Sequence, residues 1–280
     1  MRIAVTGAAG GVGGSLMALL AGRDGVEALP VTRKEADLAD GAAVRDVISR
    51  LKPDVVVHCA AMTAVDQCET DKDLARRINV EGTRAVADAV RGVKARLVYI
   101  STDYVFDGAK NGPYAPDDPP HPLNVYGLTK WEGEKIALDT SGGLVVRSSW
   151  LFSRRGKSFV RTVLELAARQ SEIKMVNDQT GTPTWSKDLA AAILVCIEKK
   201  ASGILHVTNT GECTWREYAK KILALRGISG VTVMPITSDE LGRPARRPKN
   251  SRLDCSAYVA LAGQPLRRWD EALKEMLETL

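Results

Sequence analysis

The chain has 280 residues, of which 45% are hydrophobic and 26% are charged, and its formal net charge is +5. This composition suffices for one large core, or for a main domain with a smaller one, and argues against a disordered chain. No apolar run approaches the ~20 residues that a transmembrane helix needs, and the longest candidate, Leu189 to Ile197, is predicted to be a buried helix. The modest positive charge suits a polyanionic small molecule as well as a nucleic acid, so it does not choose between them.

Cysteine and histidine usage indicates neither a disulfide framework nor a zinc site. The five cysteines are odd in number and scattered, without any Cys-x-x-Cys spacing, and the three histidines are also dispersed. We interpret the histidines as structural. The chain enters an apolar strand directly after Met1 and Arg2, without the longer apolar segment of a secretory signal, and this favours a cytoplasmic protein.

Short β-branched runs alternate with longer amphipathic stretches in the first half of the chain. In chain order, the predicted strands are Ile3 to Thr6, Ala28 to Thr32, Val55 to His58, Leu97 to Ser101 and Leu144 to Ser148, and helical patterns separate them. Near-continuous apolar strands that alternate with helices indicate a parallel sheet covered on both faces, and right-handed crossovers make it doubly wound. We therefore predict an α/β fold of the Rossmann type, with a binding crevice beyond the carboxyl ends of the strands.

The alternation loosens after about Trp150. Helical patterns follow near Phe159 to Arg169, Lys187 to Lys199 and Trp215 to Leu225, with strand-like pieces at Ile204 to Thr208 and Val231 to Pro235. A loop rich in proline and arginine, Gly242 to Arg252, precedes the last helix. We expect residues 1–150 to form the Rossmann domain, and residues 151–280 to form mainly a smaller C-terminal substrate-binding lobe that is interleaved with the first domain.

A glycine-rich turn follows the first predicted strand. Thr6 runs straight into Gly7-Ala8-Ala9-Gly10-Gly11-Val12-Gly13, and a helical pattern begins at Ser15. Glycines permit a tight turn and a close backbone approach, while the following helix N-terminus offers unpaired N–H groups and a positive dipole end to a pyrophosphate. The spacing is Gly-x-x-Gly-x-x-Gly rather than the simplest dinucleotide fingerprint, but its place after the first strand of a β/α repeat predicts a nucleotide site here, Gly7 included.

The end of the second strand bears on the choice between the two nicotinamide cofactors. An acidic side chain at this point binds a 2′-hydroxyl and repels a 2′-phosphate. Here the segment reads Val31-Thr32-Arg33-Lys34, with two cations and no acid. The Rossmann domain is therefore predicted to bind NADP(H), with Arg33 as the better phosphate ligand because a guanidinium can bind phosphate in a bidentate way. NADH stays a second candidate, and an ordinary exposed turn is the alternative interpretation.

Tyr126 and Lys130 stand four residues apart in a helical context, which places a phenol and an ammonium on the same face. Such a pair is common by chance, but Ser101-Thr102-Asp103 stands at the end of the fourth strand, where a hydroxyl would enter the crevice that the helix borders. A nearby ammonium and a cationic nicotinamide favour the phenolate form of Tyr126. Hydride addition to a carbonyl creates an alkoxide, which Tyr126 can protonate and Thr102 can stabilise. The alternative is an exposed tyrosine and a solvated lysine on an amphipathic helix.

Motifs along nearly the whole chain resemble one family. Besides the glycine turn and the Tyr-x-x-x-Lys pair, they are Asp37-Leu38, Ala60 to Asp66, Ser101 to Gly108, Arg147 to Trp150, Asn177 to Thr184 and Arg247 to Leu253. In combination they resemble the dTDP-4-dehydrorhamnose reductases, a family of extended short-chain dehydrogenases/reductases. The resemblance implies an NADPH-dependent oxidoreductase of dTDP-rhamnose biosynthesis that reduces the C4 ketone of dTDP-4-dehydro-6-deoxy-L-mannose. Its partner is then a nucleotide sugar, and neither a nucleic acid nor a membrane.

The resemblance also implies roles for individual residues. Thr102, Tyr126 and Lys130 would be catalytic. Together with Tyr126 and Lys130, the residues implied to line the cofactor are Gly10, Gly11, Val12, Asp37, Leu38, Ala60, Ala61 and Thr63. The residues implied to face the sugar are Val65, Tyr104 and Trp150. On charge grounds, Arg247 and Lys249 of the proline-rich loop are candidate ligands of the substrate diphosphate, with a merely solvated basic loop as the alternative.

The chain departs from the family pattern at a few positions. Some members dimerise through a magnesium site with a glutamate just after the glycine turn, but this chain has Gly13-Gly14-Ser15 there. We therefore expect no metal site and no magnesium-bridged dimer, and the oligomeric state stays open. His58-Cys59 stands where Asn-Ala is usual and Met62 where tyrosine is common, so the sugar is less constrained than the reaction. Two alternatives remain: another nucleotide-sugar ketoreductase or epimerase, and a non-catalytic NADP-binding regulatory subunit of the methionine adenosyltransferase type.

Overall fold

A six-stranded parallel sheet forms the centre of the computed structural model, which describes residues 1–156 and 158–279. Its strands are β1 (Arg2–Thr6), β2 (Glu27–Val31), β3 (Val55–His58), β4 (Arg96–Thr102), β5 (Leu144–Ser148) and β10 (Gly203–His206). They lie in the order β10-β5-β4-β3-β1-β2, and each neighbouring pair is parallel. The direction of winding reverses between β1 and β3, so a crevice is expected beyond their carboxyl ends.

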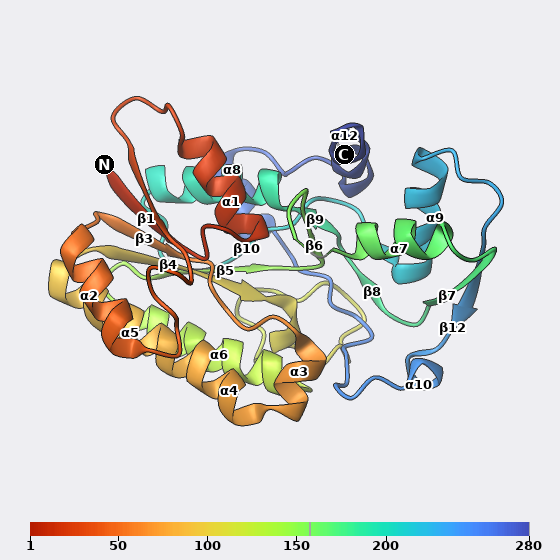
Figure 1. Ribbon diagram of the computed structural model, residues 1–280, viewed down its shortest axis with the longest axis horizontal. Coiled ribbons are helices and arrows are strands. Elements are labelled where there is room, and N and C mark those ends of the chain that lie inside the picture. The colour runs from red at the N-terminus through yellow and green to blue at the C-terminus, as the bar shows by residue number, and fades with distance from the viewer. Residues whose placement is uncertain (157, 280) are drawn as a thin grey trace.

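Helices cover both faces of this sheet (Figure 1). On one face lie α1 (Gly11–Leu20), α8 (Ser186–Glu198) and α11 (Ser256–Ala262); on the other lie α2 (Gly41–Leu51), α5 (Gly82–Val93) and α6 (Val125–Leu138). The strand pattern explains the two layers, because successive side chains of a strand point to opposite faces. Ile3 and Val5 belong to the core under α1 and α8, whereas Ala4 belongs to the core under α2 and α5. Both faces are apolar, so the strands are nearly continuous apolar runs.

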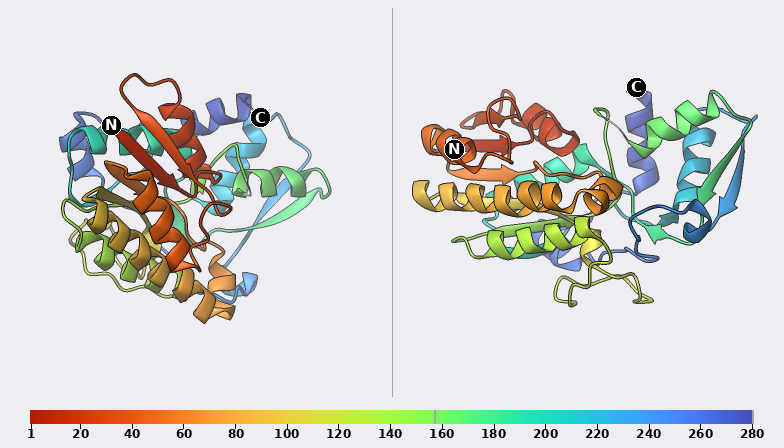
Figure 2. Two further views of the ribbon diagram at one scale, coloured as in Figure 1. Left: turned by 60° about the vertical axis from the view of Figure 1, so that its left-hand side comes forward. Right: turned by 60° about the horizontal axis from the view of Figure 1, so that its bottom comes forward.

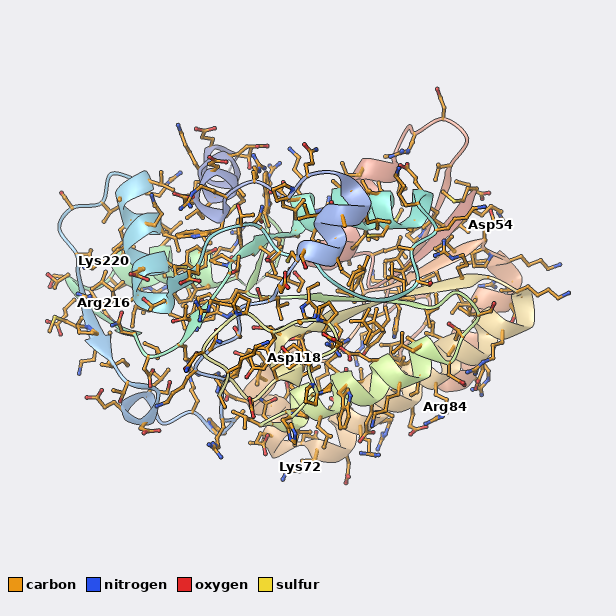
Figure 3. The ribbon with its side chains drawn as sticks, turned by 180° about the vertical axis from the view of Figure 1, so that it is seen from behind. Asp54, Lys72, Arg84, Asp118, Arg216 and Lys220 are labelled. Atoms are coloured by element: carbon orange, nitrogen blue, oxygen red, sulfur yellow. The ribbon has the colours of Figure 1, made fainter. Side chains whose placement is uncertain are left out.

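A helical connection leads from β3 to α5. It comprises α3 (Val65–Thr70), α4 (Lys72–Arg76) and a π-helical turn, Arg77–Glu81. A short 3-10 turn, Asp103–Val105, follows β4. Lys72 on α4 and Arg84 on α5 project outward from this helical layer, while the inner face of α5 is apolar (Figure 3). The charged outer face and apolar inner face explain why these helices pack flat against the sheet.

Most of the chain after Trp150 builds a smaller lobe beside the carboxyl edge of the sheet (Figures 1 and 2). Its elements are β6 (Leu151–Phe152), α7 (Phe159–Ala167), β7 (Glu172–Val176), β8 (Thr180–Gly181), β9 (Thr184–Trp185), β11 (Cys213–Thr214), α9 (Trp215–Leu225), β12 (Thr232–Ile236), α10 (Ser238–Leu241) and α12 (Trp269–Glu278). The pairs are β7 with β12, β6 with β9 and β8 with β11. Side chains of α7, α9 and α12 form a third hydrophobic cluster, so the lobe buries an apolar core of its own.

The predicted fold class is confirmed, and the predicted strands and helices agree with the structure to within one or two residues at their ends. One strand lies elsewhere than its chain position suggests. The run predicted as Ile204 to Thr208 forms β10, which pairs with β5 in the main sheet, under α8 and α11. Residue 150 is therefore not a spatial border between sheet and lobe. In the described ranges, no helix has both the length and the apolar character needed to cross a bilayer.

Candidate active site

A cleft of about 910 Å³ lies at the carboxyl edge of the sheet, between the sheet and the lobe. It brings together most of the residues that the sequence analysis singled out. The residues that line it include Gly7, Gly10, Gly11, Val12, Arg33, Asp37, Leu38, Ala60, Ala61, Thr63, Val65, Thr102, Tyr104, Tyr126, Lys130 and Trp150. Arg247 and Lys249 are not among the residues that line it.

The turn after β1 has the shape of a phosphate cradle. Gly7 has a φ of +67°, and a Cβ on it would lie 2.9 Å from the backbone nitrogen of Ala60. A Cβ on Gly13 would lie 2.2 Å from the Gly7 carbonyl oxygen, so the helix can approach the turn only without a side chain there. Gly10 precedes α1 and offers no side chain to the first N–H groups. These donors and the positive end of the helix dipole remain for a pyrophosphate, so the residues present fit a dinucleotide.

At the tip of β2, Arg33 lines the cleft and forms an ion pair with Asp37. Its Nε donates to Asp37 Oδ2 at 2.9 Å, and the Arg33 side chain is 83% exposed. A hydrogen bond from the Ala39 N–H and the pairing with Arg33 hold the pKa of Asp37 below its ordinary value. Glu35 accepts hydrogen bonds from the N–H and the hydroxyl of Thr32. The segment Val31 to Lys34 has no acid, but in the folded chain the carboxylates of Glu35 and Asp37 turn back to this tip.

Thr102 and Tyr126 meet where β4 ends and α6 begins. The Asn124 side chain caps α6 by accepting the Gly127 N–H at 2.8 Å. A Cβ on Gly127 would lie 2.1 Å from the carbonyl oxygen of Tyr104, so glycine lets the first turn of α6 pack directly on the segment after β4. This close packing places the Tyr126 side chain beside the Thr102 hydroxyl.

Tyr126 is held as a phenol. Burial raises its pKa above the ordinary value of 10.0; a hydrogen bond with the Thr102 hydroxyl acts in the opposite direction, and the Asp103 carboxylate adds to the rise. The Lys130 ammonium donates to the Ile100 carbonyl oxygen, and the expectation that it favours the phenolate together with a cationic nicotinamide stays a prediction. The protonated phenol is the form that can donate a proton to an alkoxide, which is what a reduction requires.

Lys130 is buried beside the sheet, with a side chain that is 3% exposed. Its Nζ donates to the carbonyl oxygen of Ile100 at 2.7 Å and lies 3.9 Å from the centroid of the Tyr99 ring. Burial lowers the pKa of Lys130 to about 7, while the Glu134 carboxylate one helical turn later opposes this shift. Glu134 is itself paired with the buried guanidinium of Arg147 at 2.7 Å. Because Glu134 is already paired with Arg147, little negative charge is left to stabilise the Lys130 ammonium, which lies at the edge of the cleft.

Asp103 and Ser148 are among the polar residues of the cleft to which the sequence analysis gave no role. Asp103 is 2% exposed; its Oδ1 accepts the Thr102 hydroxyl at 3.0 Å, and its Oδ2 has no partner among the described residues. Burial raises the pKa of Asp103 to about 7. Ser148, the last residue of β5, is also buried with an unpaired hydroxyl in the described part of the chain. A signal existed for both, because each stands at the carboxyl end of a strand that borders the crevice.

Aromatic rings line the cleft on the side of the lobe. Trp150 has a φ of +45°, and its ring stacks on Trp215 with centroids 3.6 Å apart and planes at 6°. A Cβ on Gly181 would lie 2.4 Å from the Trp150 ring, so glycine makes room for the indole. Tyr104 meets Tyr126 edge to face at 5.9 Å from the sheet side. Trp150 and Tyr104 thus approach the same cleft from the lobe and from the sheet.

Arg247 and Lys249, the two candidate diphosphate ligands of the proline-rich loop, do not line the cleft. Arg247 donates to Asp66 Oδ1 at 2.9 Å, and the Lys249 side chain is exposed. Burial and the Asp103 carboxylate raise the pKa of Tyr104, and the positive charge of Arg247 opposes the rise. The expectation that these two residues bind the substrate diphosphate stays a prediction.

Comparisons with known proteins agree along the whole chain. Residues 1–280 match the family model described as the RmlD substrate binding domain. A dTDP-4-dehydrorhamnose reductase of Streptomyces griseus is 42% identical over 288 residues, covering 100% of this chain and 94% of that protein. A dTDP-4-keto-6-deoxy-D-glucose reductase of Streptomyces niveus is 37% identical, covering 100% and 97%. The solved structure of the dTDP-4-dehydrorhamnose reductase of Bacillus anthracis in complex with NADP has a TM-score of 0.95 at 37% identity, covering 100% and 99%.

Proposed function

This chain belongs to the RmlD family, and we propose that it is a dTDP-4-dehydrorhamnose reductase. The enzyme uses NADPH to reduce the C4 ketone of dTDP-4-dehydro-6-deoxy-L-mannose, and the product is dTDP-L-rhamnose. The family and the oxidoreductase class predicted from the motifs are thereby confirmed. One observation carries the proposal. A single cleft is lined by the glycine turn, by Thr102, Tyr126 and Lys130, and by the aromatic rings of the lobe.

NADPH, when bound, supplies the hydride to the ketone carbon. The first N–H groups of α1 would hold its pyrophosphate and Arg33 its 2′-phosphate. Ala60, Ala61 and Thr63 would line its path toward Lys130. The relative from Bacillus anthracis, solved with NADP, supports this choice of cofactor. Because Arg33 already shares its charge with Asp37, we expect the preference for NADPH over NADH to be moderate.

Tyr126 is the proposed proton donor to the C4 oxygen as the ketone becomes an alkoxide. The Thr102 hydroxyl, which donates to Asp103, can turn and donate to the same oxygen. The Lys130 ammonium would supply positive charge to the bound cofactor. Trp150 and Tyr104 orient the sugar, and Trp150 stacks on Trp215 of the lobe, which also lines the cleft. We infer that residues 151–280 act mainly as the substrate-binding lobe and residues 1–150 as the NADP(H)-binding domain.

A second substrate is supported by one of the comparisons. The relative from Streptomyces niveus is named for dTDP-4-keto-6-deoxy-D-glucose, which differs from the first substrate in its sugar. Cys59 and Met62, which depart from the family pattern, both line the cleft and so leave the sugar pocket open to such a change. The non-catalytic alternative is not retained, because the relatives are reductases. We predicted that the chain forms no magnesium-bridged dimer and that it is cytoplasmic, and both statements stay predictions.

The decisive experiment offers the purified protein both keto-sugars. Each is supplied with NADPH or NADH while nicotinamide absorbance is followed, and the product is identified by NMR. We expect NADPH to be consumed with dTDP-4-dehydro-6-deoxy-L-mannose and the product to be dTDP-L-rhamnose. Turnover of the D-gluco sugar alone would replace the first substrate by the second. No turnover of either sugar by a folded protein that binds NADPH would overturn the proposal.

A further inference from the structure

Arg155 brings a cation from the lobe side to the cofactor end of the cleft. It follows β6 in the segment that leads toward α7, and it lines the cleft. Its guanidinium lies against α1, since a Cβ on Gly14 would be 3.0 Å from Arg155 Nη1 and 3.2 Å from its Cδ. Ser153 of the same segment also lies close to α1, since a Cβ on Gly11 would be 2.8 Å from Ser153 Oγ. The glycines of α1 thus allow a segment of the lobe to cross the first turns of the helix.

The charges around the cleft single out Arg155. A pyrophosphate carries two negative charges, and the glycine turn supplies no charged side chain to balance them. Arg33 lies at the tip of β2 and is paired with Asp37, and Lys130 is buried beside the Tyr99 ring. In the described ranges, no carboxylate lies within 4.0 Å of the Arg155 guanidinium. Its charge is therefore available to an anion at the N-terminus of α1.

We propose that Arg155 binds the pyrophosphate of the cofactor, so that the first turn of α1 and the segment after β6 hold it from two sides. The guanidinium can donate two parallel N–H groups to phosphate oxygens, which adds to the backbone donors of the helix. This inference rests on the proposed function, because it requires a nicotinamide dinucleotide in the cleft. It extends that function by making the C-terminal lobe a part of the cofactor site.

The test compares Arg155→Ala and Arg155→Lys with a matched control, Arg154→Ala. Arg154 is the preceding residue, is also exposed and does not line the cleft; its carbonyl oxygen accepts a hydrogen bond from Arg161, which the control preserves. Each variant is titrated calorimetrically with NADPH, with NADH, with dTDP and with adenosine 2′-phosphate, which lacks a pyrophosphate. Thermal unfolding checks that each variant is folded.

We expect Arg155→Ala to weaken NADPH and NADH equally, by about tenfold, or ~1.4 kcal/mol. Arg155→Lys should retain part of the affinity, and Arg154→Ala all of it. Adenosine 2′-phosphate should bind as it does to the wild type.

Three results would overturn the inference. Unchanged affinity for both dinucleotides would show that Arg155 does not contact the cofactor. A loss confined to NADPH and adenosine 2′-phosphate would place Arg155 at the 2′-phosphate. A loss of dTDP affinity with unchanged cofactor affinity would assign it to the substrate diphosphate. A wild-type protein that binds neither dinucleotide would instead contradict the proposed function itself.

Discussion

Replacing Lys130 with methionine exchanges a buried ammonium for an apolar side chain of similar length. The ammonium is in contact with one carbonyl oxygen, that of Ile100, and with the Tyr99 ring. Burial lowers its pKa from 10.5 to about 7. Below about pH 7 the folded protein must hold this charge away from water, whereas the unfolded chain holds it in water. We therefore expect the variant to lose activity and to gain stability.

The size of the gain follows from the pKa shift and its sign. Because the folded-state pKa is lowered, the unfolded chain binds more protons between about pH 7 and pH 10.5, and wild-type stability rises across this window. The shift from 10.5 to about 7 corresponds to at most ~5 kcal/mol. Methionine leaves the Ile100 carbonyl without its donor, which costs about 1–3 kcal/mol. The expected net stabilisation is about 2–4 kcal/mol at pH 7, and it vanishes near pH 9.

Urea unfolding of the cofactor-free proteins between about pH 6 and pH 10 measures this difference. Lys135→Met is the matched control, because Lys135 lies on the same helix and is exposed. The control should show no comparable gain and no pH dependence. A Lys130→Met variant that is less stable than the wild type at pH 7, or a stability difference that does not change with pH, would show that burial of the ammonium does not destabilise the fold.

Three further substitutions test single residues of the cleft. Tyr126→Phe should lower kcat by at least ~100-fold and leave NADPH affinity nearly unchanged in parallel titrations, because the hydroxyl acts on the substrate oxygen; wild-type turnover would exclude this role. Arg33→Ala should weaken NADPH about tenfold and NADH hardly at all, the exposed contact being partly screened; equal losses would show that the 2′-phosphate is not bound there. Asp103→Asn removes a carboxyl whose pKa is raised to about 7, so the wild type loses stability as pH rises from about 4 to 7. Urea unfolding should find this variant more stable by up to ~4 kcal/mol at pH 8 and equal near pH 4; a difference that does not change with pH would contradict it.

The sheet could be predicted because fully buried strands leave an unambiguous pattern. Val55–His58 and Leu144–Ser148 are apolar runs between helical patterns, and both have the predicted ends. The place of β10 could not be predicted in the same way. Its four residues have a strand-like composition, but pairing with β5 is set by contacts far along the chain. A local pattern predicts that a strand exists and does not predict which strand it joins.

The candidate site likewise has a part that local sequence patterns predict and a part that they do not. Tyr126 and Lys130 were predictable because one helical turn fixes their relation, and the glycine turn because its place after β1 fixes its role. Side-chain partners and burial are not encoded in spacing. The raised pKa of Tyr126 is an example, since it comes from burial. Arg155 gave no local signal at all, because its place beside α1 depends on how the lobe packs against the sheet.

Buried polar groups are distributed unevenly in this molecule, and the distribution itself points to the cleft. Many buried polar groups have partners: the buried Arg147 guanidinium bonds to Glu134 and to the carbonyl oxygen of Pro116. In the part of the chain that the structure describes, four buried side-chain atoms lack partners, and three of them belong to residues that line the cleft, namely Asp103, Ser148 and Tyr218. An unpaired buried polar group costs about 1–3 kcal/mol, so a fold tolerates such groups mainly where a ligand can supply the missing partner. The instability concentrated at the cleft is thus what bound cofactor and substrate can offset.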